Sequence, residues 1–356
     1  MRSKVYFAAV KDANDIRTVN GKLKRLLEKS RVLDFIQKEY RVAVKIHFGE
    51  EGHTGFVKPE HVRLVCAAIS DKGAKAFLAE TNTLYKGRRT NSKDHLAIAA
   101  EHGFTKEIIG AEIVIPDDAQ KENSIDIAIN RKLIKTAKLV RFFVDADALI
   151  GINHFKGHIM TGFAGALKNL GMGCATRVGK LMQHSDISPL VYAEKCVGCG
   201  ECEKACPTKA ISLKNNKSVI NGLKCIGCAT CIAVCPYAAI DVNWESGGST
   251  MPEKMVEYAL AVMSGKKDKV AFLNFAVKIT KECDCLAKDD PRVSPDIGIF
   301  ASCDPVSIDK ASFDLVNKAC GRDIFQELHP QRDGARQLRY AQELGLGNLD
   351  YELIEV

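Results

Sequence analysis

The sequence predicts an α/β protein in which a largely parallel sheet carries helices on both faces and is interrupted by a small inserted α+β module. Three observations lead to this prediction. The chain has 356 residues, of which 46% are hydrophobic and 27% charged, which is typical of a folded protein with more than one domain. Short apolar runs alternate with stretches of helical spacing. Eight of the 14 cysteines fall between Cys196 and Cys235.

Short apolar runs predict the strands of the sheet. These runs are residues 5–10, 41–48, 74–79, 112–115, 139–144, 270–275 and 296–301. Helical spacing predicts helices between several of them, the first through Leu23, Leu26, Leu27, Leu33 and Ile36, and others beginning at Pro59, at Asp94 and at Pro305. Strands that alternate with helices favour parallel pairing.

No apolar stretch is long enough to span a membrane. The longest, residues 139–152, contains Arg141, Asp145 and Asp147, whereas a span needs about twenty apolar residues. The N-terminal residues show no secretory pattern. We therefore expect a cytoplasmic protein with no membrane partner, in which disulfides are rare and the cysteines need another role.

The cysteine-rich segment contains two copies of one pattern. CVGCGECEKACPTKAI begins at Cys196, CIGCATCIAVCPYAAI begins at Cys225, and both fit C-x2-C-x2-C-x3-C-P. With this spacing, three thiolates of a tight loop bind one iron–sulfur cluster and the fourth cysteine binds the other cluster. We assign one [4Fe–4S] cluster to Cys196, Cys199, Cys202 and Cys235, and a second to Cys225, Cys228, Cys231 and Cys206. The alternative, a structural zinc site, would need one group of four ligands and no crossed repeat.

The segment resembles the bacterial two-cluster ferredoxins over roughly residues 188–243. This resemblance implies transfer of single electrons at low potential. Residues 186–189 and 246–249 have the composition of linkers. We expect residues 188–243 to be a ferredoxin domain inserted into one discontinuous α/β domain of residues 1–187 and 244–356. Two separate arms are the alternative, but the C-terminal arm has few strands for a sheet of its own.

Polar side chains follow several of the predicted strands. In open α/β sheets, ligands bind outside the carboxyl ends of the strands. Acids, bases, metal ligands and a thiol gather at these ends, which is the set of groups that an active site needs. The candidate catalytic residues are Lys45, His47, Asn153, His154, Lys156, His158, Cys303 and Asp304. Asp304 before Pro305 also fits a helix cap.

Glycine-rich stretches follow two of these groups. Residues 49–55 predict a loop that covers a ligand. Residues 157–173 predict a helix through Met160, Phe163, Ala164, Leu167 and Leu170. Its functional interpretation is an anion site at the helix N-terminus, assisted by Lys168, Thr161 and Lys156. The alternative is a helix that packs tightly on the sheet through its small residues.

Cys283-Asp284-Cys285 is a second cysteine motif. Cysteines separated by one residue rarely form an unstrained disulfide, so metal ligation and redox chemistry are the functional interpretations. A zinc site would need Cys303 or a histidine to complete it. Loop thiols without a role remain the alternative.

The chain resembles the family called domain of unknown function 362, in its ferredoxin-containing form, through the repeat and three further stretches: KIHFGEEGHTGFVKPEHVR, DALIGINHFKGHIMTGFAGALKNLGMG and ECDCLAKDDPRVSPDIGIFASCDPVSIDKAS. The resemblance covers almost the whole chain and implies that both arms belong to one domain. The motif residues are Lys45, His47, Asn153, His154, Lys168, Cys283, Cys285, Asp304 and Asp309. The family implies no catalytic role for any of them.

These observations favour an iron–sulfur oxidoreductase in which two clusters relay electrons to a substrate or metal site at the strand ends. The alternatives are a non-enzymatic electron carrier or docking subunit of a larger redox complex, and a metal or cluster carrier. We expect a redox partner protein or electron carrier and a small-molecule substrate; a flavin stays open, although no flavin or nicotinamide fingerprint appears. Nucleic acid is not indicated, because the basic faces lack a binding motif.

Overall fold

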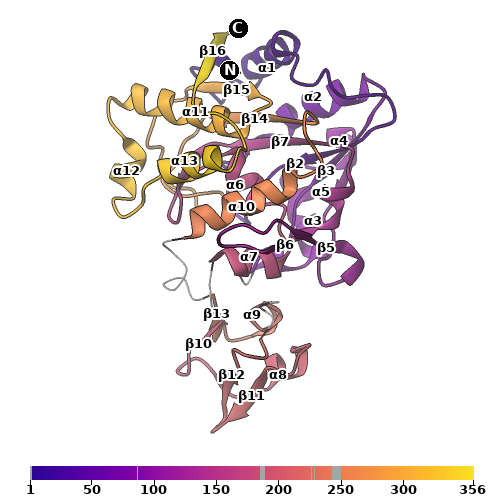
Figure 1. Ribbon diagram of the computed structural model, residues 1–356, viewed down its shortest axis with the longest axis vertical. Helices are drawn as coiled ribbons and strands as arrows, with labels where there is room; N and C mark the ends of the chain where they lie inside the picture. Colours follow the sequence, from indigo (N-terminus) through magenta and orange to yellow (C-terminus); the bar gives the residue numbers. More distant parts are fainter. Residues whose placement is uncertain (1, 86, 185–188, 226, 228, 243–249) are drawn as a thin grey trace.

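The computed structural model describes residues 2–85, 87–184, 189–225, 227, 229–242 and 250–356. Its centre is a large sheet of eight strands in the order β16-β1-β15-β14-β7-β2-β3-β4 (Figure 1). The strands are β1 (Ser3–Ala9), β2 (Arg41–Lys45), β3 (Lys75–Ala79), β4 (Glu112–Val114), β7 (Ala148–His154), β14 (Val270–Ala276), β15 (Gly298–Ser302) and β16 (Tyr351–Glu355). β15 is antiparallel to both neighbours, whereas every other adjacent pair is parallel. This mostly parallel sheet confirms the predicted fold class.

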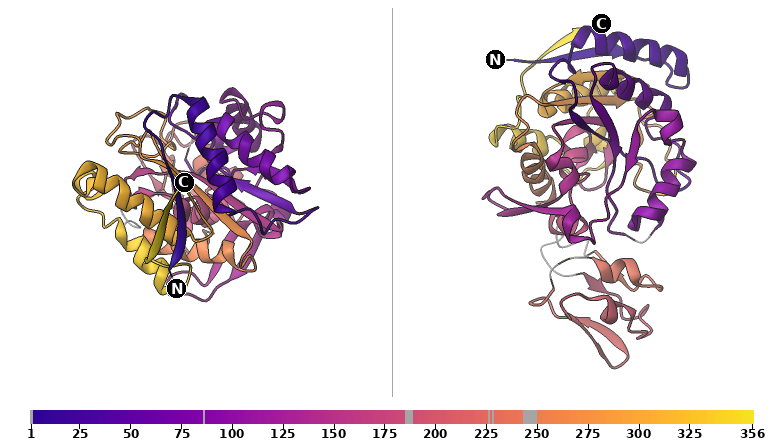
Figure 2. Two further views of the ribbon diagram at one scale, coloured as in Figure 1. Left: turned by 90° about the horizontal axis from the view of Figure 1, so that it is seen from above. Right: turned by 90° about the vertical axis from the view of Figure 1, so that its right-hand side faces the viewer.

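Helices cover both faces of the sheet (Figure 2). α1 (Ile16–Ser30) and α2 (Pro59–Ser70) pack on one face, while α6 (Ala166–Gly171) and α11 (Pro305–Cys320) pack on the other. α10 (Met251–Met263) and α13 (Ala335–Glu343) lie outside α6. An apolar core fills each side of the sheet. Among the described residues, no helix is long and apolar enough to cross a membrane.

α1 shows how the sequence determines such an element. Asp15 accepts a hydrogen bond from the Thr18 N–H at 3.0 Å and caps the helix. Val19, Leu23 and Leu26 then recur at helical spacing and are fully buried against the sheet. The helix ends at Ser30, where Arg31 follows in a left-handed conformation, earlier than the predicted run through Ile36.

Other elements complete the two faces and their edges. They are α3 (Ser92–Glu101), α4 (Lys106–Ile109), α5 (Arg141–Asp145), α7 (Arg177–His184), α12 (Ile324–Leu328), η1 (Arg88–Thr90), η2 (Lys121–Asn123), β5 (Ser124–Ala128), β6 (Thr136–Val140), β8 (Lys156–His158) and β9 (Gly162–Ala164).

The predicted strand at residues 139–144 is wrong. Its first residues belong to β6, which pairs with β5 in a separate antiparallel sheet, and its remainder forms α5. The strand of the large sheet is β7, which begins at Ala148 and is buried along its whole length. A strand buried on both faces lacks polar alternation, so the continuous apolar run gave no signal for its position.

The predicted helix at residues 157–173 is only partly correct. β8 and β9 form a hairpin, and α6 begins only at Ala166. The Asp309 carboxylate accepts hydrogen bonds from the N–H groups of Ala166 and Leu167 at 2.7 and 2.9 Å. A carboxylate of the chain itself therefore occupies the place predicted for an anion, and the anion site at this helix N-terminus is overturned.

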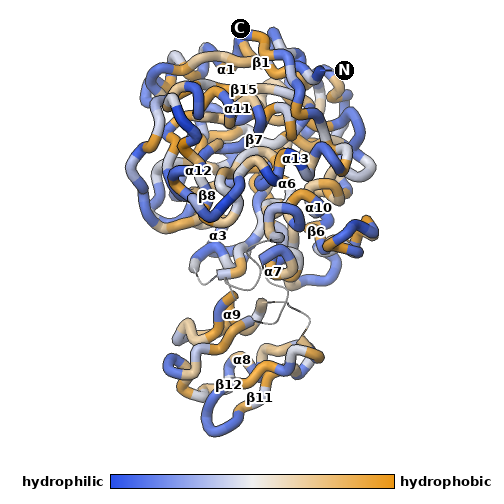
Figure 3. Tube along the Cα trace, turned by 60° about the vertical axis from the view of Figure 1, so that its left-hand side comes forward, coloured by the Kyte–Doolittle hydropathy of each residue, from blue (hydrophilic) through white to orange (hydrophobic). Residues whose placement is uncertain are grey.

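The cysteine-rich segment forms a smaller body that projects from one end of the large one (Figures 1 and 2). It contains β10 (Leu190–Val191) paired with β13 (Ile240–Asp241), the hairpin of β11 (Ile211–Lys214) and β12 (Lys217–Ile220), and the short helices α8 (Glu201–Ala205) and α9 (Thr230–Val234). The hairpin tip is hydrophilic (Figure 3). Strands of the large sheet both precede and follow this segment in the sequence. The predicted linkers lie outside the described residues except for Pro189.

Candidate functional site

A cavity of about 840 Å³ lies at the carboxyl ends of β2, β3 and β7. The residues predicted from the sequence that line it are Lys45, His47, Asn153, His154, Lys156, His158, Lys168, Cys283 and Cys285. These side chains meet because the strands are parallel and therefore end at the same edge of the sheet. The cysteines arrive on the loop after β14, whose carboxyl end lies beside that of β7.

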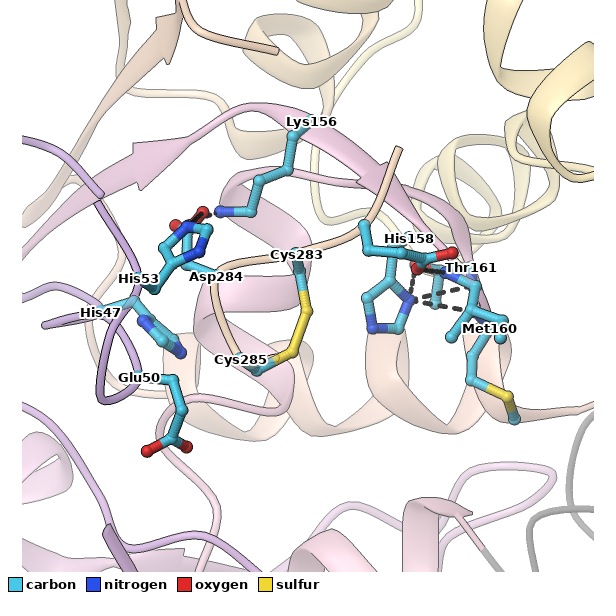
Figure 4. The surroundings of a disulfide bond; sticks show 12 residues. His47, Glu50, His53, Lys156, His158, Met160, Thr161, Cys283, Asp284 and Cys285 are labelled. Atoms are coloured by element: carbon cyan, nitrogen blue, oxygen red, sulfur yellow. Dashed lines mark hydrogen bonds and ion pairs between the residues drawn. A yellow bond between two sulfur atoms is a disulfide. The ribbon is translucent and has the colours of Figure 1, made fainter. Parts of the chain in front are cut away.

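Asp284 is the charge centre of this cavity. Its carboxylate, almost fully buried, contacts His53 Nε2 at 3.0 Å, His154 Nδ1 at 2.9 Å and the ammonium of Lys156. Burial alone would raise the pKa of Asp284, but the charges of His154 and Lys156 hold it well below its usual value. The carboxylate therefore stays ionised and holds three basic side chains beside the C-x-C turn, of which Figure 4 shows His53 and Lys156.

Lys45 is held in a second buried ion pair. Its ammonium lies 2.7 Å from Glu80 Oε1 and 2.8 Å from Asn169 Oδ1, and it donates to the carbonyl of Ile46. Asn169 in turn donates to Asn153 Oδ1 at 2.7 Å. This network orients Lys45 and Asn153 as parts of the cavity wall.

His47 is held by Arg89. Arg89 Nη1 lies 3.0 Å from His47 Nε2, and the guanidinium also pairs with Glu50 at 2.8 Å and donates to the Tyr85 hydroxyl. Burial, followed by the charge of Arg89, holds the pKa of His47 well below its usual value. The imidazole is therefore neutral near pH 7.

Lys168 projects from α6 into the cavity without an acidic partner. Among the side chains that the structure describes, none makes a hydrogen bond or ion pair with its ammonium. Burial, followed by the charge of Lys156, lowers the pKa of Lys168 to about 7. Nearby, burial lowers the pKa of Lys180 to about 8, and its ammonium bonds to the Thr81 hydroxyl at 2.6 Å. The cavity thus holds a cation that is available to a ligand.

Cys283 and Cys285 form a disulfide on the cavity wall. A ring nitrogen of His158 and both sulfur atoms lie within 4.8 Å of one another. Thr161, predicted as an anion ligand, instead supports His158, because its hydroxyl oxygen lies 2.9 Å from the His158 Nδ1 and 2.6 Å from the carbonyl oxygen of Phe163.

Cys303 and Asp304 do not join this cavity. They follow β15, which runs antiparallel to its neighbours, so they lie at the opposite edge of the sheet. Asp304 caps α11 by accepting hydrogen bonds from the N–H groups of Val306 and Ser307. The grouping predicted for these two residues is therefore wrong, and Cys303 cannot complete a metal site with the C-x-C pair.

Several residues that line the cavity, or that hold its lining in place, were not predicted from the sequence. Asp284 stands between the two cysteines, so its place in the motif was a signal for its role. His53 and Glu50 belong to the predicted covering loop, and the loop does bond to the motif: the Glu50 N–H donates to the Asp284 carbonyl at 3.1 Å. Arg89 had no signal, because it belongs to a loop between two predicted elements.

The cysteine-rich body provides its own donor set. A cavity there is lined by Cys206 from the first repeat together with Cys225 and Cys231 from the second. This arrangement fits the crossed assignment of the second cluster, whose fourth predicted ligand, Cys228, lies outside the described residues. Equivalent N–H groups point at the last cysteine of each repeat: Ala210 donates to Cys206 Sγ and Ala239 donates to Cys235 Sγ, both at 3.2 Å.

Two of the donors predicted for the first cluster also lie close to each other. Cys196 Sγ and Cys202 Sγ both contact the Ser218 hydroxyl, at 3.7 and 3.1 Å. Burial alone would raise the pKa of Cys196 and of Cys206, but backbone N–H donors lower both pKa values overall. Thiolates are the form that binds iron, so the donor chemistry fits iron–sulfur clusters.

An apolar contact joins the two bodies. Leu84 and Leu181 from the large body belong to the same buried cluster as Cys202, Cys231 and Cys235. The backbone of Gly227, inside the second cysteine repeat, packs on Leu181, where a Cβ would lie 3.3 Å from Cδ2. Leu84 also lines the large cavity. Leu84 therefore belongs both to the buried cluster of the ligand cysteines and to the cavity wall.

Comparison with known proteins gives three findings. The model of the family described as Domain of unknown function (DUF362) matches residues 42–314. The chain is 48% identical over 32 residues to Ferredoxin-2 of Desulfomicrobium norvegicum, a match that covers 9% of this chain and 54% of the ferredoxin. The chain thus spans little more than half of this relative.

Two solved structures are similar in general form. The lactate racemase apoprotein of Thermoanaerobacterium thermosaccharolyticum matches with a TM-score of 0.42 and 14% identity, over 90% of this chain and 57% of that one. A protein of Thermotoga maritima matches with a TM-score of 0.40 and 13% identity, over 88% and 59%. At these scores neither similarity carries a conclusion about a reaction.

Proposed function

Because the chain belongs to the family described as Domain of unknown function (DUF362), whose description names no reaction, we propose its function from its own residues. It is an iron–sulfur oxidoreductase that brings electrons through its cysteine-rich body to the large cavity, where an anionic small molecule is reduced. An external one-electron donor of low potential supplies the electrons.

The cysteine-rich body has the ligands for two [4Fe–4S] clusters. The ligand sets are Cys196, Cys199, Cys202 and Cys235 for one, and Cys225, Cys228, Cys231 and Cys206 for the other. The cavity that joins cysteines of both repeats and the similarity to a ferredoxin support this assignment. When bound, such clusters supply electrons one at a time.

The observation that carries the proposal is the position of Leu84. It packs in the buried cluster of the ligand cysteines and also lines the cavity. A redox module that only docks on a larger complex would not need a charged cavity at the end of its own cysteine core. The contact therefore favours an enzyme over a docking subunit.

The charges of the cavity favour an anionic substrate. Lys45, Lys156 and Arg89 are already paired with Glu80, Asp284 and Glu50. The ammonium of Lys168 has no such partner among the described side chains, so it is available to a carboxylate, sulfate or phosphate group.

The iron content tests the cofactor assignment. Anaerobic loading with iron and sulfide should give about eight irons per chain and an electron paramagnetic resonance signal after reduction. Cys206→Ser should lose about half of the iron, whereas Cys303→Ser, at the opposite edge of the sheet, should keep all of it. Zinc in place of iron, or the same iron content in both variants, would contradict the proposal.

A further inference from the structure

We propose that Cys283 and Cys285 are a redox-active dithiol–disulfide pair that receives the electrons arriving in the cavity, and that His158 donates a hydrogen bond to the thiolate formed on reduction. The inference rests on the proposed function and deepens it, since it names the group that the electrons reach first.

The pair is placed where both electrons and substrate arrive. The disulfide lies on the cavity wall, with Cys283 buried and Cys285 half-buried. Both residues line the cavity, and Cys285 is the more exposed of the two. An exposed and a shielded thiol form the usual division between the sulfur that reacts with a substrate and the sulfur that closes the disulfide again.

The turn is held independently of its S–S bond. The Asp284 carboxylate is fixed by His53, His154 and Lys156, while the Asp284 carbonyl accepts the N–H of Glu50. The Tyr85 hydroxyl donates to the carbonyl of Cys285 at 3.0 Å. None of these bonds involves the sulfur atoms, so the backbone of the turn stays in place when the disulfide opens and the two sulfur atoms move apart.

His158 is oriented toward the pair. Its Nδ1 accepts hydrogen bonds from the N–H groups of Met160 and Thr161, both at 3.2 Å, so the proton of the neutral ring is on Nε2. The ring lies between this turn and the disulfide (Figure 4), with Nε2 on the side away from the turn. Burial, followed by the charge of Lys168, holds the pKa of His158 well below its usual value, so the ring stays neutral.

The electron count of the step balances. The S–S bond breaks when it takes up two electrons, one sulfur takes a proton from water in the cavity, and the other becomes a thiolate that accepts the Nε2–H bond of His158. Two one-electron carriers supply the pair of electrons that a disulfide requires. The tautomer of His158 favours this role over metal ligation, because a protonated Nε2 has no lone pair for a metal.

Thiol labelling tests the inference. The loaded protein is reduced anaerobically with photoreduced deazaflavin, quenched with N-ethylmaleimide under denaturing conditions, and its peptides are weighed. We expect two labels on the peptide of Cys283 and Cys285 after reduction and none before. In Cys206→Ser with Cys225→Ser, which removes two ligands of the second cluster, and in the iron-free wild-type chain, labelling should be at least about tenfold slower.

Each other outcome overturns the inference. An unlabelled peptide in a protein whose reduced clusters give a resonance signal would contradict the inference alone, whereas absence of any cluster signal would contradict the proposed function. Equal labelling in the iron-free chain would show that the clusters play no part. Labels before reduction, together with a bound metal that is lost in Cys283→Ser, would show a metal site instead.

The reactivity of the reduced pair tests the role of His158. Without its hydrogen bond the thiolate is less stable, so in His158→Ala the iodoacetamide reaction of the native reduced pair at pH 7 should slow by about tenfold, as for a pKa one unit higher, and recover at pH 9. Cluster reduction should be unchanged. The same rate at both pH values in the variant and in the wild type would contradict this role.

Discussion

Asp284 connects the stability of the cavity to its chemistry. Asp284→Asn would leave the buried ammonium of Lys156 without a charge partner. Breaking a buried pair in this way costs about 3–5 kcal/mol of unfolding free energy, whereas the loss of an exposed pair costs at most about 1 kcal/mol. Urea unfolding should therefore separate Asp284→Asn from Glu112→Gln, which removes the surface partner of Lys106. Equal losses of unfolding free energy in the two variants would contradict the buried ion pair of Asp284 and Lys156.

Asp284 also makes the stability of the folded protein depend on pH. The pKa of Asp284 is held below its unfolded value by His154 and Lys156. The stability that this provides is complete above the usual aspartate pKa of about 4 and is lost as the pH falls below it. In urea titrations, the unfolding free energies of the wild type and of Asp284→Asn should differ by less at pH 3 than at pH 7. A constant difference would mean that the carboxylate is not ionised in the folded protein.

The pKa of Lys168 predicts that anion binding in the cavity depends on pH. Its pKa of about 7 reflects burial, followed by Lys156, Asp284, Glu80 and Lys45. The ammonium is present below pH 7 and is lost above it, so calorimetry should show sulfate binding that weakens as the pH rises from 6 to 8. Lys168→Met should bind sulfate at least about tenfold more weakly at pH 6, whereas the surface variant Lys75→Met should match the wild type. Unchanged binding in Lys168→Met would remove the argument for an anionic substrate.

Some of the cavity residues could be predicted from the sequence, and others could not. The rule that ligands bind at strand ends correctly predicted that Lys45, His154 and Lys156 lie in one cavity. It failed for Cys303 and Asp304 because the direction of β15 is decided by pairing with distant strands, which no local pattern reports. Asp309 was noticed only as a motif residue, since a cap from another helix depends on the tertiary fold.

At the scale of elements, α6 carries the cavity residues Lys168 and Asn169 and packs closely on α10. A Cβ at Gly171 would lie 2.0 Å from the carbonyl oxygen of Met255. Gly171→Ala should therefore lower the unfolding free energy by at least about 1–3 kcal/mol, because the added methyl group overpacks the contact. Gly21→Ala, in the exposed middle of α1 with no atom near its Cβ, should raise it by up to about 1 kcal/mol. Urea titrations check both, and a tolerated Gly171→Ala would contradict the packing.

Most helices and strands were predictable because one face of each is apolar at the expected period. β7 and the β8–β9 hairpin were not, for opposite reasons. β7 lies in an apolar run with no polar alternation to mark its start. In the hairpin, Met160 and Phe163 imitate helical spacing, but Gly162 takes a φ of +77°, a value that a helix does not contain.

At the scale of the whole molecule, the contact between the two bodies decides whether electrons reach the cavity. Leu181→Arg would place a charge in the apolar contact with the second cysteine repeat. We expect unchanged iron content and at least about tenfold slower thiol formation at Cys283 and Cys285, because a charge buried without a partner separates the surfaces. Leu223→Arg, at a fully exposed position of the same segment, is the matched control. Equal rates would show that the contact carries no electrons.

The most direct test of the account is the number of electrons that one loaded chain takes up. In an anaerobic coulometric titration, two clusters take about one electron each and a disulfide takes about two, so the wild type should take up about four. The Cys283→Ser, Cys285→Ser double variant, loaded with the same iron, should take up about two. The same count in both proteins would contradict the claim that electrons entering the cysteine-rich body reach the cavity.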